Sequence, residues 1–165
     1  MISPVQFIRL IQKEINLIIS LSKNIQQEQL SYKPKDSMRS MQELMQYLTG
    51  CGYYYAAYWK TNGEISVADY FKEIREKAIP VTLENFEEKM KQELDWIKTL
   101  VHSYNQDEWQ HKMVKFPWGE EAPLGEAMIE TSLKWLTAYK YQLFVYIKIS
   151  GDIPLSTRDV WVMPL

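Results

Sequence analysis

The chain has 165 residues, which is enough for one domain whose core buries about two-thirds of the unfolded surface. Its formal net charge is −2 and it contains no basic block, so it lacks the electrostatic pattern of a nucleic-acid-binding protein. No apolar run is long enough to span a bilayer, and the N-terminus has an amphipathic pattern instead of a signal peptide. A single cysteine excludes an internal disulfide. We therefore expect a cytoplasmic protein, a single domain over residues 1–165, that binds neither nucleic acid nor membranes.

The N-terminal half predicts two long helices. Ser3 followed by Pro4 is typical of a helix start, and apolar residues recur at helical spacing from there to about residue 23. A polar connection then leads to a second helix over residues 40–59, which begins with a capping box at Ser40. Two glycines at 50 and 52 lower the helix propensity inside it, which suggests that another helix approaches closely there.

The C-terminal half predicts two further long helices. A polar crossing contains a short helix over 67–79, and the third long helix runs from a cap at Thr82 to about residue 101. An irregular stretch with a short extended segment at 111–116 precedes the fourth helix, which covers 124–150 and has Gly151 as its C-terminal cap. The apolar tail beyond it is expected to pack on the helices or on a partner. Four long amphipathic helices with almost no strand pattern predict an all-α four-helix bundle with a long connection between helices two and three.

Three segments in this order and spacing resemble the DinB-like superfamily over nearly the whole chain. They are EQLSYKPKDSMRSMQELMQYL leading into helix two, FPWGEEAPLGEAM leading into helix four, and YKYQLFVYIKISG closing helix four. The resemblance implies a four-helix bundle of the up-down-down-up type. The superfamily includes metal-dependent hydrolases and thiol-dependent transferases, so the resemblance also implies these two activities as candidates.

The resemblance further implies where a metal site would lie. In that superfamily three histidines typically bind a divalent metal such as zinc or nickel between helices two and four. The stretches ELMQYL and WLTAYKYQL match the histidine motifs and place Tyr47, Trp135 and Tyr139 at the ligand positions. Tryptophan has no lone pair for a metal, and tyrosine binds well only as phenolate, with an ordinary pKa of about 10. We therefore expect neither a metal nor another cofactor at this site.

The same two helices predict the lining of a cleft. Helical spacing puts one stripe of residues on helix two and a second on helix four. The two stripes are Tyr47, Cys51, Tyr54 and Tyr58, and Met128, Thr131, Trp135, Tyr139, Gln142 and Tyr146. If they face each other, as the resemblance implies, they line an aromatic cleft that suits a small organic ligand. The alternative, and the favoured one, is that the rings fill the space as core.

The other reactive side chains support weaker hypotheses. Cys51 is expected in mid-helix among tyrosines, where a buried thiol is inert, although the relatives' chemistry keeps it as a candidate nucleophile. His102 and His111 are the two histidines of the chain, and neither has a partner at ligand spacing. A displaced metal site that combines His111 with Glu120 or Glu121 is a further alternative.

Three functions are compatible with these features. The preferred one is a protein that has lost the three-histidine site and binds a small molecule or a partner without catalysis. The second is a divergent hydrolase or thiol-dependent transferase that works through Cys51 or a tyrosine hydroxyl. The third is a structural dimerisation module. We expect a homodimer in any case, because bundles with apolar outer faces often pair about a twofold axis. The sequence identifies neither ligand nor substrate.

Overall fold

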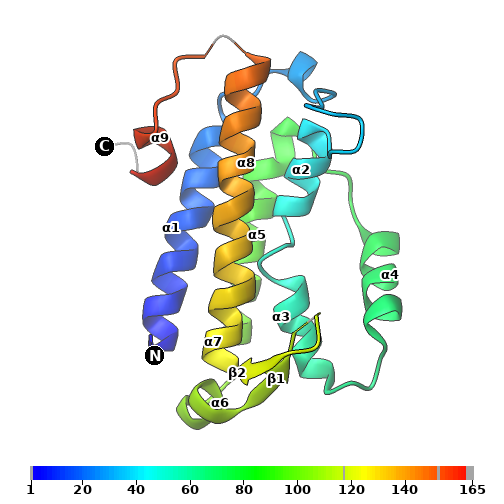
Figure 1. Cartoon of the computed structure of the whole chain (residues 1–165), viewed down its shortest axis with the longest axis vertical. Coiled ribbons are helices and arrows are strands. Elements are labelled where there is room, and N and C mark those ends of the chain that lie inside the picture. The colour runs from blue at the N-terminus through cyan, green and yellow to red at the C-terminus, as the bar shows by residue number, and fades with distance from the viewer. Residues whose placement is uncertain (1, 117, 152, 163–165) are drawn as a thin grey trace.

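The computed structural model describes residues 2–116, 118–151 and 153–162, and it is mostly helical, in agreement with the predicted all-α class. Its long elements are α1 (Pro4–Ser22), the pair α2 (Met41–Leu48) and α3 (Tyr54–Tyr58), α5 (Leu83–His102) and α8 (Lys134–Ser150). Helix α1 packs against α5 and α8, and α2 packs against α8. Helices α1 and α8 run in one direction, whereas α5 and the α2–α3 pair run in the other (Figure 1). Among the described residues, no helix combines the length and apolarity needed to cross a membrane.

The three helix starts predicted from side-chain caps are confirmed. The hydroxyls of Ser3, Ser40 and Thr82 each accept a hydrogen bond from the backbone N–H three residues further on. In each case the side chain of that third residue accepts in return from the N–H of the cap. These bonds satisfy N–H groups that have no partner within the helix, so the local sequence determines where the helices begin.

The second long helix is not continuous, and the prediction of a single helix over 40–59 is wrong. It stops after Leu48 and resumes at Tyr54. At the break the N–H of Gly52 donates to Oε1 of Glu93 on α5, at 2.8 Å. A Cβ at Gly52 would lie 2.8 Å from a methyl carbon of Leu136 on α8. The expected close approach is therefore confirmed, but the contact replaces helical hydrogen bonds with a bond to a neighbouring helix.

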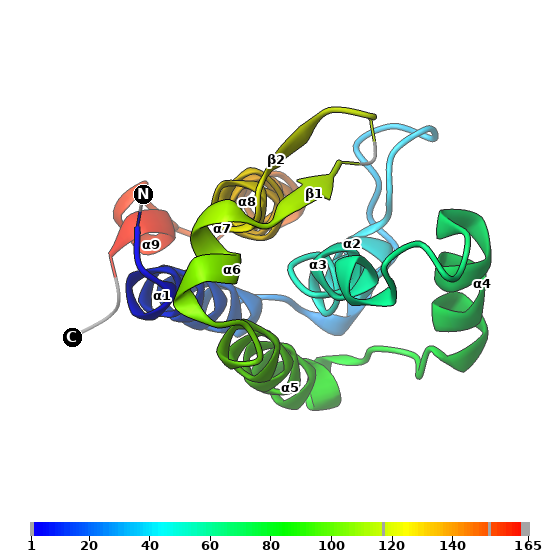
Figure 2. The ribbon, with the colours of Figure 1, turned by 90° about the horizontal axis from the view of Figure 1, so that it is seen from below.

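Short elements connect the long ones. The 3-10 turns η1 (Gln27–Gln29) and η2 (Trp59–Thr61) follow α1 and α3, and α4 (Val67–Lys77) confirms the predicted short helix. Figure 2 shows α4 set apart from the other helices, beside the α2–α3 pair. Helix α6 (Gln106–His111), which was not predicted, precedes an antiparallel hairpin of β1 (Met113–Lys115) and β2 (Glu121–Pro123). The extended segment expected at 111–116 is thus confirmed at its centre, and its partner strand is new.

The fourth long helix is confirmed from residue 124 to residue 150, with an internal irregularity. Helix α7 (Leu124–Met128) passes through the π-helical segment η3 (Ile129–Leu133) directly into α8. Gly151 caps its end as predicted, although in an extended conformation instead of the left-handed one. A Cβ at Gly151 would lie 2.6 Å from Nε2 of Gln29, so any other residue there would have to displace the end of the Gln29 side chain.

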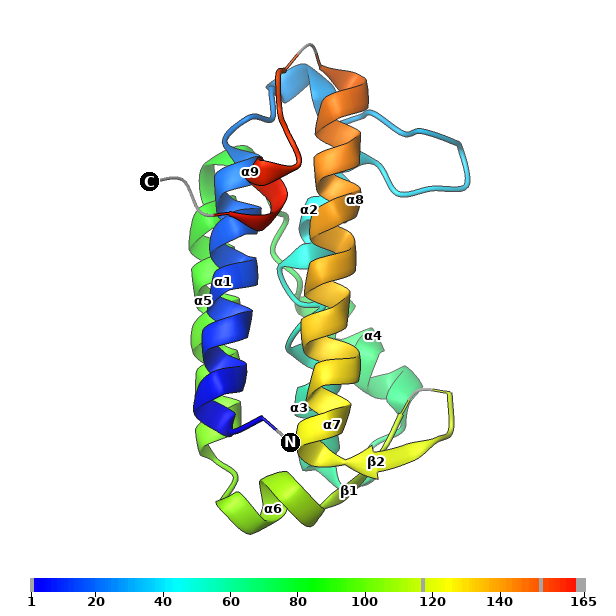
Figure 3. The ribbon, with the colours of Figure 1, turned by 60° about the vertical axis from the view of Figure 1, so that its left-hand side comes forward.

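The described part of the tail packs on the helices, as expected. Helix α9 (Arg158–Trp161) lies across α1 and α8 (Figure 3). It buries Val160 completely and places the ring of Trp161 4.3 Å from Nζ of Lys140. Lys140 has no exposed surface and forms an ion pair with Glu14 of α1 at 2.8 Å. The tail therefore covers a buried ion pair between two long helices. Residues 152 and 163–165, which the same expectation included, lie outside the described residues.

Candidate functional site

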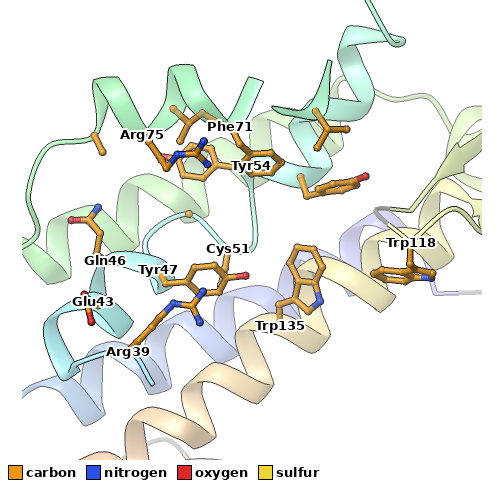
Figure 4. Close-up of a pocket in the computed structure, with 15 residues that line it drawn as sticks. Arg39, Glu43, Gln46, Tyr47, Cys51, Tyr54, Phe71, Arg75, Trp118 and Trp135 are labelled. Carbon is orange, nitrogen blue, oxygen red and sulfur yellow. The ribbon is translucent and has the colours of Figure 1, made fainter. Parts of the chain in front are cut away.

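A pocket of about 660 Å³ lies between the α2–α3 pair, α4 and the start of α8. We call it the aromatic pocket. Figure 4 shows labelled rings on its opposite walls, with Phe71 and Tyr54 on one side and Tyr47 and Trp135 on the other. Its full lining is Arg39, Glu43, Gln46, Tyr47, Gly50, Cys51, Tyr54, Tyr55, Val67, Phe71, Ile74, Arg75, Ala78, Trp118 and Trp135.

The break between α2 and α3 shapes one wall of the pocket. Because the chain leaves the helical path at Thr49–Tyr53, Gly50 and Cys51 come to the pocket surface between Tyr47 and Tyr54. Any other residue at Gly50 would have to displace the ring of Tyr54, since a Cβ there would lie 1.9 Å from one of its ring carbons. The two glycines that weaken the helix thus bring these side chains to a common surface.

Tyr55 joins the three elements that surround the pocket. Its ring stacks on Phe71 of α4 with 6.0 Å between centroids, and it meets Trp135 of α8 edge to face at 6.1 Å. Tyr55 is itself 5% exposed and therefore well supported. Aromatic pairs in such geometries are worth about 0.5–1.5 kcal/mol beyond the area that they bury. These contacts hold α4 against the rest of the molecule.

Helix α4 forms the outer wall of the pocket and has no buried residue of its own. Val67, Phe71, Ile74 and Arg75 line the space, and Phe71 and Ile74 are only partly buried. Apolar residues at this spacing share one helix face, which here faces the pocket. A ligand in the pocket would bury more of these side chains, so occupancy would strengthen the attachment of α4.

Tyr47 and Tyr139, two of the three positions where the resemblance places metal-binding histidines, contact each other. Their rings meet edge to face at 4.6 Å, and the guanidinium of Arg39 lies 4.2 Å from the ring centroid of Tyr47. Burial raises the pKa of Tyr47 well above its ordinary value of 10, with further contributions from Cys51 and Tyr139. A raised pKa disfavours the phenolate that metal binding would need. The third position, Trp135, offers an indole with no free lone pair.

Elsewhere in the described part of the chain, no three side chains of His, Cys, Asp or Glu gather closely enough to hold a metal ion. His111 is exposed, with Nδ1 2.9 Å from a carboxylate oxygen of Asp107, one turn earlier on α6. Glu120 accepts a hydrogen bond from the indole N–H of Trp118. His102 lies in the last turn of α5. The residues present thus do not fit the divalent metal that the resemblance implies, either at the expected positions or at the alternative site of His111 with Glu120 or Glu121.

Cys51 lies beside a buried carboxyl group. The cysteine is 7% exposed, and burial together with the nearby Glu93 raises the pKa of its thiol well above the ordinary value of 9.0. Glu93 has no exposed surface, and burial raises its pKa from 4.5 to about 8. Both groups are therefore protonated near neutral pH, the opposite of what an activated thiolate needs. The expectation of an unreactive cysteine agrees with this environment, although Cys51 borders the pocket.

The predicted cleft residues fall into two groups. Tyr47, Cys51, Tyr54 and Trp135 line the aromatic pocket, and Tyr139 supports Tyr47 from behind. The others lie away from it and correct the predicted lining; they are Tyr58, Met128, Thr131, Gln142 and Tyr146.

Each of these five side chains has other contacts. Tyr58 lies one turn after Tyr54 at the end of α3, and its hydroxyl donates to the carbonyl of Ile65. Met128 and Thr131 are buried at the π-helical segment, where the hydroxyl of Thr131 donates to a backbone carbonyl. Gln142 donates to the hydroxyl of Tyr146, which donates to the carbonyl of Arg39 at 3.1 Å. The last two thus fix the segment that carries Arg39.

Sequence reasoning missed the charged and outer residues of the pocket. Arg39 precedes α2, whereas Arg75 belongs to α4, and Trp118 belongs to the turn of the hairpin. The signal for α4 was present, because Phe71 and Ile74 are spaced as one helix face in an otherwise polar crossing. Nothing in the local sequence indicated which neighbour that face would contact.

Comparisons with known proteins bear on the fold. No protein-family model matches the chain, and no curated protein matches its sequence. The structure is similar to that of a DinB-like protein, YjoA, from Bacillus subtilis, with a TM-score of 0.68, 17% identity, and coverage of 92% of this chain and 96% of that one. It is also similar to a candidate member of the DinB family from Exiguobacterium sibiricum, with a TM-score of 0.70, 18% identity, and coverage of 93% and 95%. The chain therefore has the DinB-like fold, and the resemblance seen in the sequence is confirmed at that level.

Proposed function

We propose that this protein binds a small organic molecule with an apolar body in the aromatic pocket, and that it does so without metal-dependent catalysis. The observation that carries the proposal is the pocket of about 660 Å³ among aromatic side chains. Sites for small molecules typically enclose about 300–1,000 Å³ and combine apolar walls with a few polar groups. The aromatic pocket has that size and composition, with the guanidinium, amide and thiol groups of Arg39, Gln46 and Cys51 at its surface.

We further infer that Tyr47, Trp135 and Tyr139 mark a degenerate metal site. In this interpretation α1, the α2–α3 pair, α5 and α8 form the predicted four-helix bundle. The three aromatic residues occupy the position of its metal site, between the second and fourth of these helices. The edge-to-face contact of Tyr47 with Tyr139 and the raised pKa of Tyr47 support it. Elemental analysis of the untagged protein tests it directly. About one bound metal per chain at this place would contradict it.

A divergent hydrolase or thiol-dependent transferase remains the second candidate, because Cys51 borders the pocket. A nucleophilic cysteine needs a nearby cation, histidine or helix N-terminus that lowers its pKa. Here the buried Glu93 and the loss of solvation raise the pKa of the thiol. The environment of Cys51 therefore favours binding over thiol chemistry.

Filling the pocket tests the binding proposal. Val67 lines the pocket at the start of α4 and is 40% exposed, so Val67→Trp adds an indole at the pocket wall. Val5, at the start of α1, is 73% exposed and gives the matched control Val5→Trp. The probe is N-phenylnaphthylamine, a neutral dye that fluoresces in apolar surroundings. The wild type and Val5→Trp should bind the dye, and Val67→Trp should bind at least about tenfold more weakly, a difference of about 1.4 kcal/mol.

Circular dichroism and thermal unfolding show whether both variants keep the fold. Equal binding by a folded Val67→Trp protein would place the dye elsewhere and remove the support for this pocket. Absence of dye binding by the wild type would contradict the proposed function itself.

A further inference from the structure

We propose that the ligand of the aromatic pocket is an organic anion, namely a ring-containing apolar body that carries a carboxylate. This inference rests on the proposed function and assigns a chemical class to the ligand of that site. Three observations support it. Two guanidinium groups lie on opposite walls of the pocket, and aromatic rings lie between them (Figure 4). The one carboxylate in the lining, that of Glu43, is already bonded to other groups.

The two arginines come from segments far apart in the sequence. Arg39 precedes α2 and Arg75 lies on α4, so only the folded chain brings them to one pocket. In the part of the chain that the structure describes, no carboxylate lies within ion-pairing distance of either guanidinium. Several exposed lysines, by contrast, pair with a glutamate one turn away, as Lys91 does with Glu87 at 2.6 Å. The two guanidinium groups are thus available to an anion from outside.

The one carboxylate in the lining does not neutralise these arginines. Glu43 accepts a hydrogen bond from the N–H of Ser40 at 2.6 Å and lies 3.3 Å from Nζ of Lys33. These contacts lower the pKa of Glu43, chiefly through the Ser40 N–H. The negative charge of Glu43 is thus compensated by the helix cap and by Lys33 and not by the two arginines. The tyrosines and the thiol of the lining are neutral near pH 7. The pocket therefore carries a net positive charge.

Arg39 is held in an orientation that suits a carboxylate. Its guanidinium lies over the face of Tyr47 at 4.2 Å and is 5.8 Å from the ring centroid of Tyr139. Stacking on a ring occupies the face of a guanidinium and leaves its N–H edges free. Two of these N–H groups match the two oxygens of a carboxylate in a bidentate pair. The orientation is set before the ligand arrives, so less conformational entropy is lost on binding.

The remaining lining determines the body of the ligand. Tyr55, Phe71 and Trp135 form connected ring contacts, and Val67 and Ile74 add aliphatic surface. A small, fully charged anion would leave these walls in contact with water, whereas a ring system would stack on them. A volume of about 660 Å³ accommodates two fused rings together with a short acidic side chain. The walls and the arginines together select an amphipathic acid.

The test compares two ligands of nearly equal size, the anionic 1-naphthaleneacetate and the neutral 1-naphthaleneacetamide, by isothermal titration calorimetry at low and high salt. The carboxylate should bind the wild type about tenfold more tightly than the amide, and added salt should reduce this difference because both guanidinium groups are solvent-exposed. Arg39→Gln and Arg75→Gln should each weaken the carboxylate severalfold and leave the amide unchanged. The control Arg9→Gln removes an exposed arginine of α1 and should change neither.

The outcomes separate this inference from the proposed function. If the amide binds as tightly as the carboxylate, or if both arginine variants bind the carboxylate like the wild type, the anionic ligand class is wrong and the pocket proposal stands. Failure of the carboxylate to bind a protein that binds N-phenylnaphthylamine also overturns the inference. If the dye does not bind either, the proposed function fails first. Because Arg75 is exposed on α4, Arg75→Gln keeps the test valid even if Arg39→Gln unfolds.

Discussion

Replacing Glu93 by glutamine tests whether one buried carboxyl group makes the stability of the protein depend on pH. The Glu93 side chain has no exposed surface, and its Oε1 accepts the N–H of Gly52 at the break between α2 and α3. Within the described residues, Oε2 has no hydrogen-bond partner. Loss of solvation raises the pKa of Glu93 from 4.5 to about 8.

The sign and size of the effect follow from linkage between protonation and folding. Between these two pKa values the carboxyl group is protonated in the folded protein and ionised in the unfolded chain. Its contribution to stability is therefore fully present below pH 4.5 and is lost as the pH rises through about 8. Since one pKa unit corresponds to about 1.4 kcal/mol, the loss between pH 5 and pH 9 is on the order of 4 kcal/mol.

The assay is urea unfolding of the wild type and of Glu93→Gln at pH 5 and pH 9. Glutamine cannot ionise but keeps the oxygen that accepts the Gly52 N–H, so the variant should lose about 4 kcal/mol less than the wild type over this range. Glu88→Gln changes an exposed glutamate of the same helix and should follow the wild type. Other titrating groups are common to all three proteins, and the thiol of Cys51, whose pKa is raised chiefly by burial and only secondarily by Glu93, stays protonated in each folded protein. An equal pH dependence of the wild type and Glu93→Gln would refute the reasoning.

Three further predictions concern other parts of the molecule. Lys140→Met leaves Glu14 buried without its partner and should lower the free energy of unfolding, measured in urea, by about 3–5 kcal/mol. The double variant with Glu14→Gln should recover part of this loss. Equal stability of the wild type and both variants would contradict the role of the ion pair. In the folded protein Cys51 should react with a disulfide reagent at least about a hundredfold more slowly than in the unfolded chain, because burial raises the pKa of its thiol. A fast reaction in the folded protein would support the alternative of a thiol-dependent transferase. Light scattering should give the mass of a homodimer, with the exposed and stacked rings of Tyr141 and Trp161 as one candidate contact; a strictly monomeric species at high concentration would oppose it.

Local patterns were sufficient for most of the fold. Ser3, Ser40 and Thr82 mark helix starts because each cap satisfies backbone N–H groups within four residues of itself. The long helices follow from apolar periodicity in the same way. The break after Leu48 did not follow from such patterns, because the Gly52 N–H within it bonds to the carboxyl group of Glu93, which lies 41 positions beyond Gly52 in the chain. Two glycines indicated a weak point in the helix but not the partner that would replace its hydrogen bonds.

The candidate site was predicted only in part, for the same reason. Helical spacing placed Tyr47 and Cys51 on a common stripe, and both line the pocket. Tyr54, the first residue of α3 after the break, lines the pocket, whereas Tyr58 at the other end of α3 does not, and its hydroxyl bonds to the carbonyl of Ile65. The outer wall on α4 and the two arginines were missed because their contacts join segments that the sequence leaves unrelated.

The sequence by itself determined where the helices capped by Ser3, Ser40 and Thr82 begin and which of their faces are apolar. It also determined that the three expected ligand positions carry rings that coordinate metals poorly. These properties depend on neighbours within one or two helical turns and on the chemistry of single side chains. Only the tertiary structure decided whether the rings filled the space or left a pocket, because that depends on the placement of α4 and on how Tyr47 and Tyr139 pack. It also decided the charge of the pocket, since Arg39 and Arg75 meet there only after distant segments have folded together.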